Sequence, residues 1–546
     1  FFYVQGNNPS DNTMVTLIHT RVRLCSLLLL PMLAACVHAP AVTTIYGVVS
    51  VGGPMAGAHI AVRDSQGARV TTRADARGQY TLNAAGLVAP LVLSASSEPH
   101  GNCRYNHKPR AICLTALATA LSPAGNQVNI NALTDQMVSD VASALHFVGP
   151  QQLAETPYIP AVPLPVQAES LRQLRAGFGS ALASAGVADV EHFDPVTTPM
   201  QADGSGVDAV LGVINHTRGY DNETGEASST VITDMAWRPI AGPFGPAANE
   251  PLQYERARME LERIRSANVR IFIVGDSTAA TYERQRLPRM GWGQVFADQF
   301  RADGGIAVVN GARAGRSSRD FYNGGWYRQM MRFMQPGDYV FIAHGHNDQN
   351  CNGLRAARGV ADVTNLCTYP NTATGQRQHP PGQTQMSFQS SLETYIADAR
   401  ARGAHPILMT PTTRFMNADR KTAYANGDTR PVVSQHLTRQ NAVGGYAFVG
   451  NYSQTIQDTA RANHLPLIDL EAKTIRFANA HAHDWQAYWL VVTDTVKYPW
   501  YATQTAGTPA APDTTHFQEA GARAVAELVA EDRKSTRLNS SHTMTS

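Results

Sequence analysis

The chain is poor in charged residues, and neither sign is in excess. Asp, Glu, Lys and Arg make up only 16% of its 546 residues, compared with about 25% in an average globular protein. The 45 Lys and Arg residues nearly balance the 43 Asp and Glu residues and are spread along the sequence. The clustered positive charge that nucleic-acid binding requires is therefore missing. Neither the 43 glycines nor the 31 prolines follow a period, which excludes collagen and coiled coils, and a hydrophobic content of 43% excludes a wholly disordered chain.

The apolar segment near the N-terminus, Leu24–Leu33, is too short to span a bilayer as a permanent helix. A short basic stretch precedes it, and small residues follow it, which is the order of a secretory signal. The residues at the end of this signal, Leu33-Ala34-Ala35-Cys36, resemble a bacterial lipobox. We therefore expect residues 14–36 to be a lipoprotein signal, with Cys36 lipidated and the protein anchored to a membrane of the bacterial cell envelope, in the periplasm or at the cell surface. The alternative is an ordinary signal peptide with an incidental cysteine.

Cysteine is scarce, with six residues in the chain. Export predicts an oxidising compartment, in which thiols pair as disulfides. Apart from the two cysteines of the signal region, four remain, and they form two pairs that are close in sequence. We predict the disulfides Cys103–Cys113 and Cys351–Cys367, although four cysteines allow three pairings. A metal site with four cysteine ligands is the alternative, but the sequence contains no C-x-x-C motif.

The region before residue 267 is expected to contain two parts. Residues 43–96 show short β-rich runs separated by turn signals, which predict a small β-sandwich. This part resembles carboxypeptidase regulatory-like domains, which usually serve as spacers or adhesion modules. From residue 131 apolar residues recur at helical spacing, with a proline-rich stretch between two helices, so residues 97–266 are interpreted as a helical and linker region. At the other end, residues 533–546 resemble translated sequencing-adapter read-through and are left out of the fold prediction.

Strands and helices alternate from residue 268 onward, which predicts an α/β domain with a parallel sheet covered on both faces. The expected strands are Val269–Val274, Ile306–Val309, Tyr339–Ala343, Pro406–Thr410 and Pro466–Leu470. Sheets of this kind place their ligand sites beyond the carboxyl ends of the strands. Catalytic side chains are therefore expected directly after these segments.

Polar residues able to form a hydrolase site occur at these positions and just before the last helix. Ser277 follows the first strand, but a serine hydroxyl is a weak nucleophile and needs a base. His516 is the candidate base, and Asp513, three residues earlier, could hold its imidazole in the right tautomer. Acyl transfer also needs hydrogen-bond donors for the developing oxyanion. The backbone N–H groups of Ser277 and Gly315 and the side-chain amide of Asn347 could supply three.

These four blocks, in this order, resemble the SGNH (GDSL-like) hydrolase family over about residues 268–532. They are GDS with Ser277, AGRS with Gly315, GHND with Asn347, and DxxH with Asp513 and His516. Together with the stretch Gly291-Trp292-Gly293-Gln294, they look most like rhamnogalacturonan acetylesterases. The resemblance implies a three-layer α/β/α fold, no cofactor, and a serine esterase that removes acetyl groups from pectic polysaccharide. No G-x-S-x-G motif is present, which argues against an α/β-hydrolase lipase.

Each of these site residues also has a purely structural alternative. Ser277 could cap a following helix, Gly315 could serve a turn that needs a positive φ angle, and Asn347 could cap a loop. Asp513 could cap a turn, with His516 a surface histidine. Four blocks in order, each at a strand end or before the last helix, favour the catalytic interpretation.

The substrate is less well determined than the chemistry. An insertion at about residues 349–385 and an aromatic stretch at 485–500 could both reshape the cleft. The alternatives are an esterase acting on acetylated xylan, a lipid or a thioester, and a catalytically inert, surface-anchored carbohydrate-binding lipoprotein. The pairs His344-x-His346 and His481-x-His483 could suggest a metal, but no third ligand is indicated, so no metal site is predicted. The tryptophans of the aromatic stretch are expected in the core more often than at a sugar-stacking surface.

Overall fold

The structure is a computed structural model. It describes residues 43–98, 111–219, 229–242, 249–349, 368, 371–379, 387–419, 430–437 and 450–535. Within these residues, no helix combines the length and the apolar character that crossing a bilayer would require.

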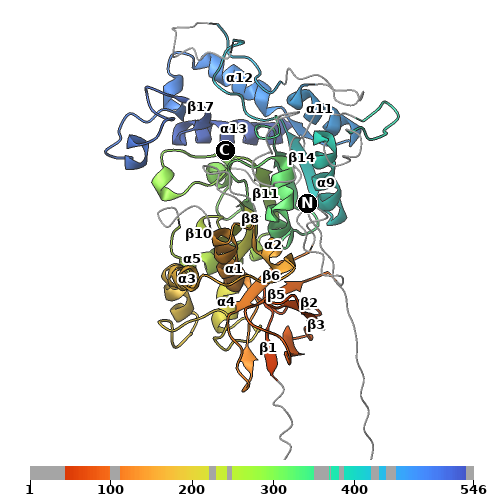
Figure 1. The fold of residues 1–546 in the computed structure, drawn as a ribbon. Coiled ribbons are helices and arrows are strands. Elements are labelled where there is room, and N and C mark those ends of the chain that lie inside the picture. The colour runs from red at the N-terminus through yellow and green to blue at the C-terminus, as the bar shows by residue number, and fades with distance from the viewer. Residues whose placement is uncertain are drawn as a thin grey trace, which may run out of the picture. The chain divides into compact units, whose positions relative to one another are not determined.

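The C-terminal half is built on a five-stranded sheet with the order β12-β11-β13-β14-β15. Its strands are β11 (Val269–Gly275), β12 (Ile306–Asn310), β13 (Tyr339–Ala343), β14 (His405–Met409) and β15 (Leu467–Ile468). All neighbouring strands run parallel, so the predicted α/β alternation is confirmed (Figure 1). Strand β15 is shorter than expected, because the side chain of Asp469 caps the helix that starts at Leu470. Strand β11 lies between β12 and β13, so the strand order reverses at β11. Ligand sites of such sheets usually lie beyond the carboxyl ends of the strands at this point.

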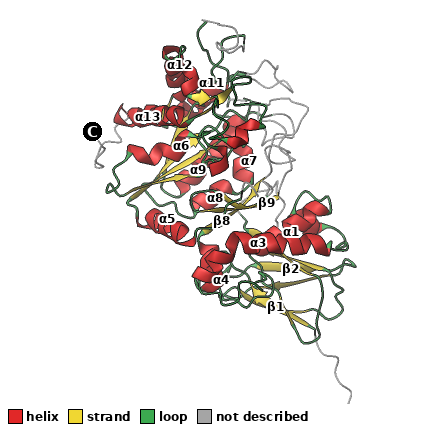
Figure 2. Ribbon diagram, turned by 90° about the vertical axis from the view of Figure 1, so that its left-hand side faces the viewer, coloured by secondary structure: helices red, strands yellow, loops and turns green. Residues whose placement is uncertain are grey.

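Alternate residues of the strands face two different helical layers, which gives the expected three-layer α/β/α arrangement (Figure 2). Phe272 and Val274 pack in one core with the first layer, and Ile271 and Ile273 pack in a second core with the other. The first layer consists of α5 (Tyr254–Ser266), α8 (Trp326–Met331), α9 (Phe388–Ala401) and α11 (Tyr452–Ala462). The second consists of α6 (Trp292–Val295), α12 (Leu470–Ala480) and α13 (Glu519–Ser535).

The N-terminal region contains two sheets, as predicted, but it extends further along the chain. One sheet has the order β4-β1-β7 and the other β3-β2-β5-β6. The strands are β1 (Thr44–Val48), β2 (His59–Arg63), β3 (Arg69–Arg73), β4 (Gln79–Asn83), β5 (Leu91–Ser96), β6 (Cys113–Ala118) and β7 (Asn126–Gln127). The predicted boundary at residue 96 is therefore wrong, because β6 pairs with all six residues of β5 and β7 pairs with β1.

Residues 97–266 do not form a linker. They supply β6, β7, the helices α1 (Ala132–Ala144) and α3 (Leu164–Ser184), and a third sheet of order β10-β9-β8. Its strands are β8 (Ile214–Gly219), β9 (Ser229–Asp234) and β10 (Pro239–Ala241). One continuous apolar core joins this region to the first face of the parallel sheet. The interpretation as a linker failed because the apolar partners of these segments are far away in sequence.

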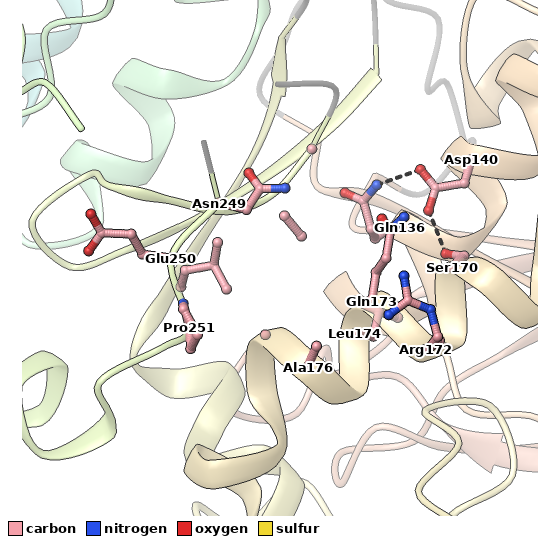
Figure 3. A pocket seen from close by; sticks show the side chains of 14 residues that line it. Gln136, Asp140, Ser170, Arg172, Gln173, Leu174, Ala176, Asn249, Glu250 and Pro251 are labelled. Atoms are coloured by element: carbon pink, nitrogen blue, oxygen red, sulfur yellow. Dashed lines mark hydrogen bonds between the residues drawn. The ribbon is translucent and has the colours of Figure 1, made fainter. Parts of the chain in front are cut away.

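Helix α1 begins at a reciprocal cap. The side chain of Asn131 accepts hydrogen bonds from the backbone of Leu133 and Thr134, and Thr134 Oγ1 accepts one from the backbone of Asn131. A cavity of about 240 Å³ lies between α1, α3 and residues 249–251 (Figure 3). Its wall includes Asp140.

Short elements complete the described chain. They are α2 (Pro150–Glu155), α4 (Gly206–Gly212), α7 (Ser318–Asn323), β16 (Trp489–Leu490), β17 (Asp513–Phe517) and the 3-10 helices η1 (Arg284–Arg286), η2 (Phe296–Gln299), η3 (Trp485–Ala487) and η4 (Pro499–Ala502). Strands β16 and β17 form an antiparallel pair outside the main sheet.

Candidate active site

Ser277 lies on the turn directly after β11 and is 7% exposed. The side chain of Asp276 stabilises this turn by accepting hydrogen bonds from Thr278 N (3.0 Å) and Thr278 Oγ1 (2.9 Å). The hydroxyl of Tyr282 donates to the carbonyl of Ser277 at 2.7 Å. No helix begins at Ser277, since the next helical segment in the described chain is η1 at Arg284. The alternative role of Ser277 as a helix cap is therefore wrong.

The block Gly291-Trp292-Gly293 packs on the turn that carries Ser277. The backbone N–H of Trp292 donates to the carbonyl of Thr278 at 3.0 Å. A Cβ atom at Gly293 would lie 2.6 Å from the carbonyl oxygen of Ala279, so only glycine allows this close approach. The block thus supports the position of the serine.

The imidazole of His516 connects Ser277 to Asp513, although 239 positions separate the serine from the histidine. Its Nε2 atom lies 2.8 Å from Ser277 Oγ, and its Nδ1 atom lies 2.6 Å from Asp513 Oδ2. The other carboxylate oxygen of Asp513 accepts the backbone N–H groups of Thr515 (2.9 Å) and His516 (3.1 Å). An imidazole in this position can accept the proton of the serine, while the carboxylate holds its second nitrogen as a donor.

The aromatic stretch at 485–500 holds the strand that carries His516. Trp489 in β16 pairs with Phe517 in β17, and the carbonyl of Phe517 accepts the backbone N–H of Met290 at 3.0 Å. Trp485 and Trp489 are 3% and 1% exposed, so these two tryptophans belong to the core, as expected. The pairing of Trp489 with Phe517 thus helps to fix the position of His516, the preceding residue.

Gly315 and Asn347 lie on neighbouring loops, after β12 and β13. The φ angle of Gly315 is +72°, a value that favours glycine. The side-chain amide of Asn347 donates to the carbonyl of Arg316 at 3.1 Å, next to Gly315. The preceding residue, His346, makes a backbone hydrogen bond to the carboxylate of Asp276, beside Ser277. The three candidate oxyanion donors therefore come from the ends of three neighbouring strands.

Comparison with known proteins places this arrangement in a family. Residues 271–529 match the family of GDSL-like lipases and acylhydrolases. All five candidate residues lie inside the matched segment. Residues 271–529 form a GDSL-like acylhydrolase domain. The chain is accordingly a carboxylic ester hydrolase.

Relatives of the acylhydrolase domain include proteins named as esterases. The chain is 28% identical over 263 residues to rhamnogalacturonan acetylesterase RhgT of Bacillus subtilis, covering 48% of this chain and 88% of the relative. It is 27% identical over 197 residues to a rhamnogalacturonan acetylesterase of Emericella nidulans, covering 35% of this chain and 72% of the relative. Among solved structures, the YxiM protein of Bacillus subtilis aligns with a TM-score of 0.34 at 19% identity, over 57% of this chain and 66% of that one.

Burial and a nearby arginine keep His516 of the acylhydrolase domain neutral. Burial lowers the pKa of His516, and the positive charge of Arg289 lowers it further, against the opposite effect of Asp513. Burial alone would raise the pKa of Asp513, but the charge of His516, its hydrogen bond and Arg289 hold it well below its usual range. At neutral pH the pair therefore consists of a neutral imidazole, ready to accept a proton, and an ionised carboxylate.

Two more carboxyl groups lie buried beneath the site. Burial raises the pKa of Asp276 to about 6, and burial raises that of Asp348 to about 7. Asp348 Oδ1 accepts hydrogen bonds from the backbone (2.8 Å) and the hydroxyl (2.7 Å) of Ser318. These contacts tie the Asn347 loop to α7, so the two carboxyl groups act as internal supports of the loops.

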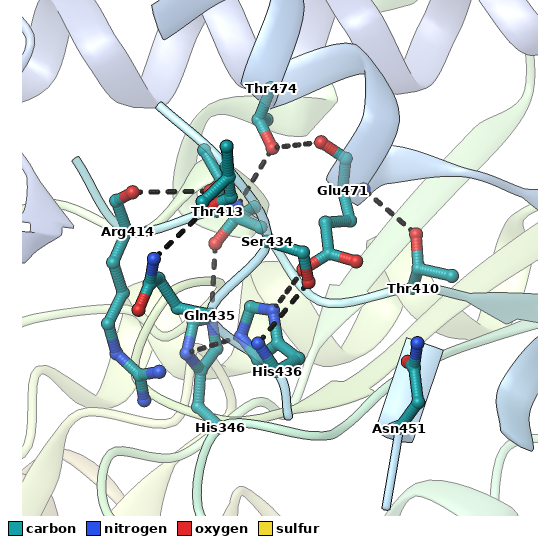
Figure 4. A network of polar contacts seen from close by, with 12 residues as sticks. His346, Thr410, Thr413, Arg414, Ser434, Gln435, His436, Asn451, Glu471 and Thr474 are labelled. Atoms are coloured by element: carbon teal, nitrogen blue, oxygen red, sulfur yellow. Dashed lines mark hydrogen bonds and ion pairs between the residues drawn. The ribbon is translucent and has the colours of Figure 1, made fainter. Parts of the chain in front are cut away.

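A polar network joins His346, the residue before Asn347, to His436 and Glu471 (Figure 4). The Nε2 atom of His346 is 3.2 Å from Thr412 Oγ1, and its Nδ1 atom is 3.2 Å from Nε2 of His436. The Nδ1 atom of His436 is 2.5 Å from Glu471 Oε1, which also accepts the Ser434 hydroxyl at 2.6 Å. Both histidines are buried, and burial lowers the pKa of each.

The candidate metal pairs do not converge with further ligands. In the described part of the chain, no three His, Cys, Asp or Glu side chains are grouped as metal ligands would be. The ring of His344 packs against Phe321 and Tyr395 instead, with centroid distances of 5.4 Å and 5.6 Å.

Most of the predicted cysteine chemistry lies outside the described residues. Cys113 is disulfide-bonded. Cys36, Cys103, Cys351 and Cys367 lie outside the described residues, and so does most of the insertion at 349–385. The lipid anchor and both disulfide pairings therefore stay predictions.

Several residues near the site were not identified from the sequence. Arg289 and Arg414 both lower the pKa of His516 through their positive charge. Arg414 lies just beyond the carboxyl end of β14, where the strand pattern predicted catalytic side chains. For Arg289, His436 and Glu471 the sequence carries no comparable signal, because they meet the site only through tertiary packing.

Proposed function

We propose that this protein is a serine acetylesterase of the rhamnogalacturonan acetylesterase type, acting on acetylated pectic polysaccharide. The observation that carries the proposal is the chain of contacts from Ser277 Oγ through His516 to Asp513. In this proposal Ser277 is the nucleophile, His516 the general base and acid, and Asp513 the residue that orients the imidazole.

The first half of the reaction forms an acetyl-enzyme. His516 Nε2 takes the proton of Ser277 Oγ as the oxygen attacks the acetyl carbonyl carbon. The resulting oxyanion is stabilised by the backbone N–H groups of Ser277 and Gly315 and by the amide of Asn347. The tetrahedral intermediate collapses when His516 returns the proton to the leaving sugar oxygen, which breaks the ester bond.

The second half releases acetate. A water molecule gives its proton to His516 Nε2 and attacks the carbonyl carbon of the acetyl-enzyme. The same three donors stabilise the second oxyanion. Collapse breaks the bond to Ser277 Oγ, which takes the proton back from His516, and acetate leaves.

Two findings support an acidic polysaccharide as the substrate. Relatives at 27–28% identity are rhamnogalacturonan acetylesterases by name. Arg289 and Arg414 place positive charge beside His516, and both side chains are only partly buried. Positive charge near the reacting group favours a substrate that carries carboxylates.

The proposed location is the bacterial cell envelope, with the chain held to a membrane by a lipid at Cys36. The lipobox-like sequence Leu33-Ala34-Ala35-Cys36 supports this. An extracytoplasmic enzyme would meet polysaccharide that cannot enter the cell.

The decisive experiment compares the wild type with Ser277→Ala on acetate release from acetylated rhamnogalacturonan, acetylated xylan and p-nitrophenyl esters of increasing chain length. We expect the pectic substrate to be preferred and the variant to lose nearly all turnover on every substrate, with unchanged thermal stability. An organophosphonate should label the wild type at Ser277 only. Wild-type hydrolysis by Ser277→Ala would disprove the mechanism, and a preference for xylan or for long acyl chains would disprove the substrate.

A further inference from the structure

A cavity of about 330 Å³ lies away from Ser277, between helix α8, the end of α9 and the N-terminal sheets. One wall is apolar and comes from the N-terminal region, with Leu114, Leu211 and Ile214 among its residues. The other wall carries three arginines, Arg328 and Arg332 from α8 and its end, and Arg402 from the end of α9. None of the described residues that line the cavity is acidic.

Two of the arginines have donor groups to spare. Arg332 uses only its Nη2 atom, which donates to the carbonyl of Ile214 and to Asn215 Oδ1, both at 3.0 Å, and lies 3.5 Å from the sulfur of Met235. Its Nε and Nη1 atoms make no hydrogen bond to any described residue. The side chain of Arg402 forms neither an ion pair nor a hydrogen bond within the described chain.

The side chains of Arg332 and Arg402 have no acidic partner among the described residues that line the cavity. Loss of hydration around the guanidinium, together with the nearby charge of Arg265, lowers the pKa of Arg332 to about 10. Arg332 therefore stays cationic at neutral pH, and the residue as a whole is exposed, as Arg402 is. An anion in the cavity would meet two guanidinium groups that are accessible to it.

His216, which also lines the cavity, has an unused polar atom as well. The residue is 8% exposed, and its Nε2 atom lies 2.8 Å from Asp135 Oδ2. Its Nδ1 atom is buried and has no hydrogen-bond partner among the described residues. Gln329 fixes this strand to α8 by donating to the carbonyl of His216 at 2.7 Å.

We propose that this cavity binds a small organic oxyanion, a carboxylate or a phosphate monoester with an apolar body. Arg332 and Arg402 would bind the anionic group, because a guanidinium presents paired donors that match two oxygens of a carboxylate or a phosphate. The apolar wall from the N-terminal region would cover the body of the ligand. Such a ligand would also link the N-terminal region to the acylhydrolase domain.

The test is calorimetric titration of the full chain with benzoate, phenyl phosphate, benzamide and sulfate. We expect benzoate or phenyl phosphate to bind and the neutral benzamide not to bind. Affinity should fall as salt rises from about 50 to about 500 mM, because salt screens the charge interaction. Comparing benzoate with phenyl phosphate identifies the preferred oxyanion.

Variants locate the site. Arg332→Gln and Arg402→Gln should each weaken binding about tenfold or more, since each removes a charged hydrogen bond. Arg461→Gln is the matched control, because Arg461 lies exposed on α11 and pairs with Asp458. Hydrolysis of p-nitrophenyl acetate should be unchanged in Arg402→Gln, whose side chain contacts no described polar group.

Three outcomes would overturn the proposal. They are equal binding of benzamide and benzoate, wild-type affinity in Arg402→Gln, and sulfate binding as tightly as both organic anions. If Arg332→Gln fails to fold, Arg402→Gln alone decides.

Discussion

The side chains of His346 and His436 meet through their ring nitrogens, with Nδ1 of the first 3.2 Å from Nε2 of the second. One proton arrangement satisfies every contact with both rings neutral. The hydroxyl of Thr412 donates to His346 Nε2, His346 Nδ1 donates to His436 Nε2, and His436 Nδ1 donates to the carboxylate of Glu471. The network thus fixes the orientation of the His346 ring, and His346 directly precedes Asn347.

Replacing His436 with phenylalanine should destabilise the protein. The ring volume is kept, but the buried Glu471 loses one of its donors and keeps the Ser434 hydroxyl, while His346 loses its acceptor. We expect the free energy of unfolding to fall by about 1–3 kcal/mol, as is typical when buried polar groups lose their partners. Urea denaturation measures this. Glu471→Gln is the control, because its amide oxygen still accepts from His436, and a loss as large as that of His436→Phe would contradict the assigned tautomers.

Asn347→Ala tests the proposed oxyanion donor. The variant keeps Ser277, His516 and Asp513, so substrate should still bind, but one of three donors to the oxyanion is lost. We expect kcat for p-nitrophenyl acetate to fall about 10²–10³-fold, with a much smaller change in KM. A wild-type kcat would show that Asn347 only supports the loop.

Arg289→Gln should shift the pH dependence of activity. The general base must be neutral, so activity rises with pH through the pKa of His516. Arg289 helps to hold this pKa below its ordinary value of 6.5. Without its charge the pKa should rise, and the acidic limb of kcat/KM should move to higher pH.

The measurement for Arg289→Gln is kcat/KM on p-nitrophenyl acetate from about pH 4.5 to 8. Arg284→Gln is the matched control, since Arg284 is exposed on η1 and is not among the main groups that shift the pKa of His516. An acidic limb at the wild-type position in Arg289→Gln would contradict the proposed influence of this arginine.

Asp140→Asn should stabilise the protein at neutral pH and not at low pH. Burial raises the pKa of Asp140 to about 6, from an ordinary value of 3.8. The folded state therefore holds a proton more tightly than the unfolded state, and stability is lost as pH rises from about 4 to about 6. Asparagine removes this loss and can keep the contacts with Ser170 and Gln136.

We expect Asp140→Asn to raise the free energy of unfolding by about 1–3 kcal/mol at pH 7.5 and to leave it nearly unchanged at pH 4. Denaturant titrations at the two pH values test this. Equal effects at both pH values would show that the carboxyl group does not titrate in this range.

Local patterns along the sequence were sufficient for much of the C-terminal half. The strand Tyr339–Ala343 was predicted with its observed bounds. Buried parallel strands are short apolar runs, and the polar residues of the site follow their carboxyl ends. Both features can therefore be recognised from short stretches of sequence. The structure brings Ser277, His516 and Asp513 within hydrogen-bonding distance of one another in the predicted order.

Residues 97–266 show the opposite behaviour. Residues Cys113–Ala118 form strand β6 because they pair with β5. Trp326 of α8 contacts the same region, since its Nε1 atom donates a hydrogen bond of 2.9 Å to the carbonyl of Arg218. The sequence around β6 does not indicate its pairing with β5, and the sequence around Arg218 does not indicate its contact with Trp326. The helical pattern of α1 and α3 was read correctly, but it suggested a linker where the structure has a packed core.

The sequence by itself therefore determined the parallel sheet, the order of its chemical blocks and the family, because these depend on the period of apolar residues and on short motifs. Tertiary structure alone decided that Arg289 lies beside His516, that His436 joins His346 to Glu471, and that Arg332 and Arg402 line one cavity. Each of these juxtapositions joins side chains from different elements. Their positions are set by packing and burial over the whole domain, which no local stretch of sequence specifies.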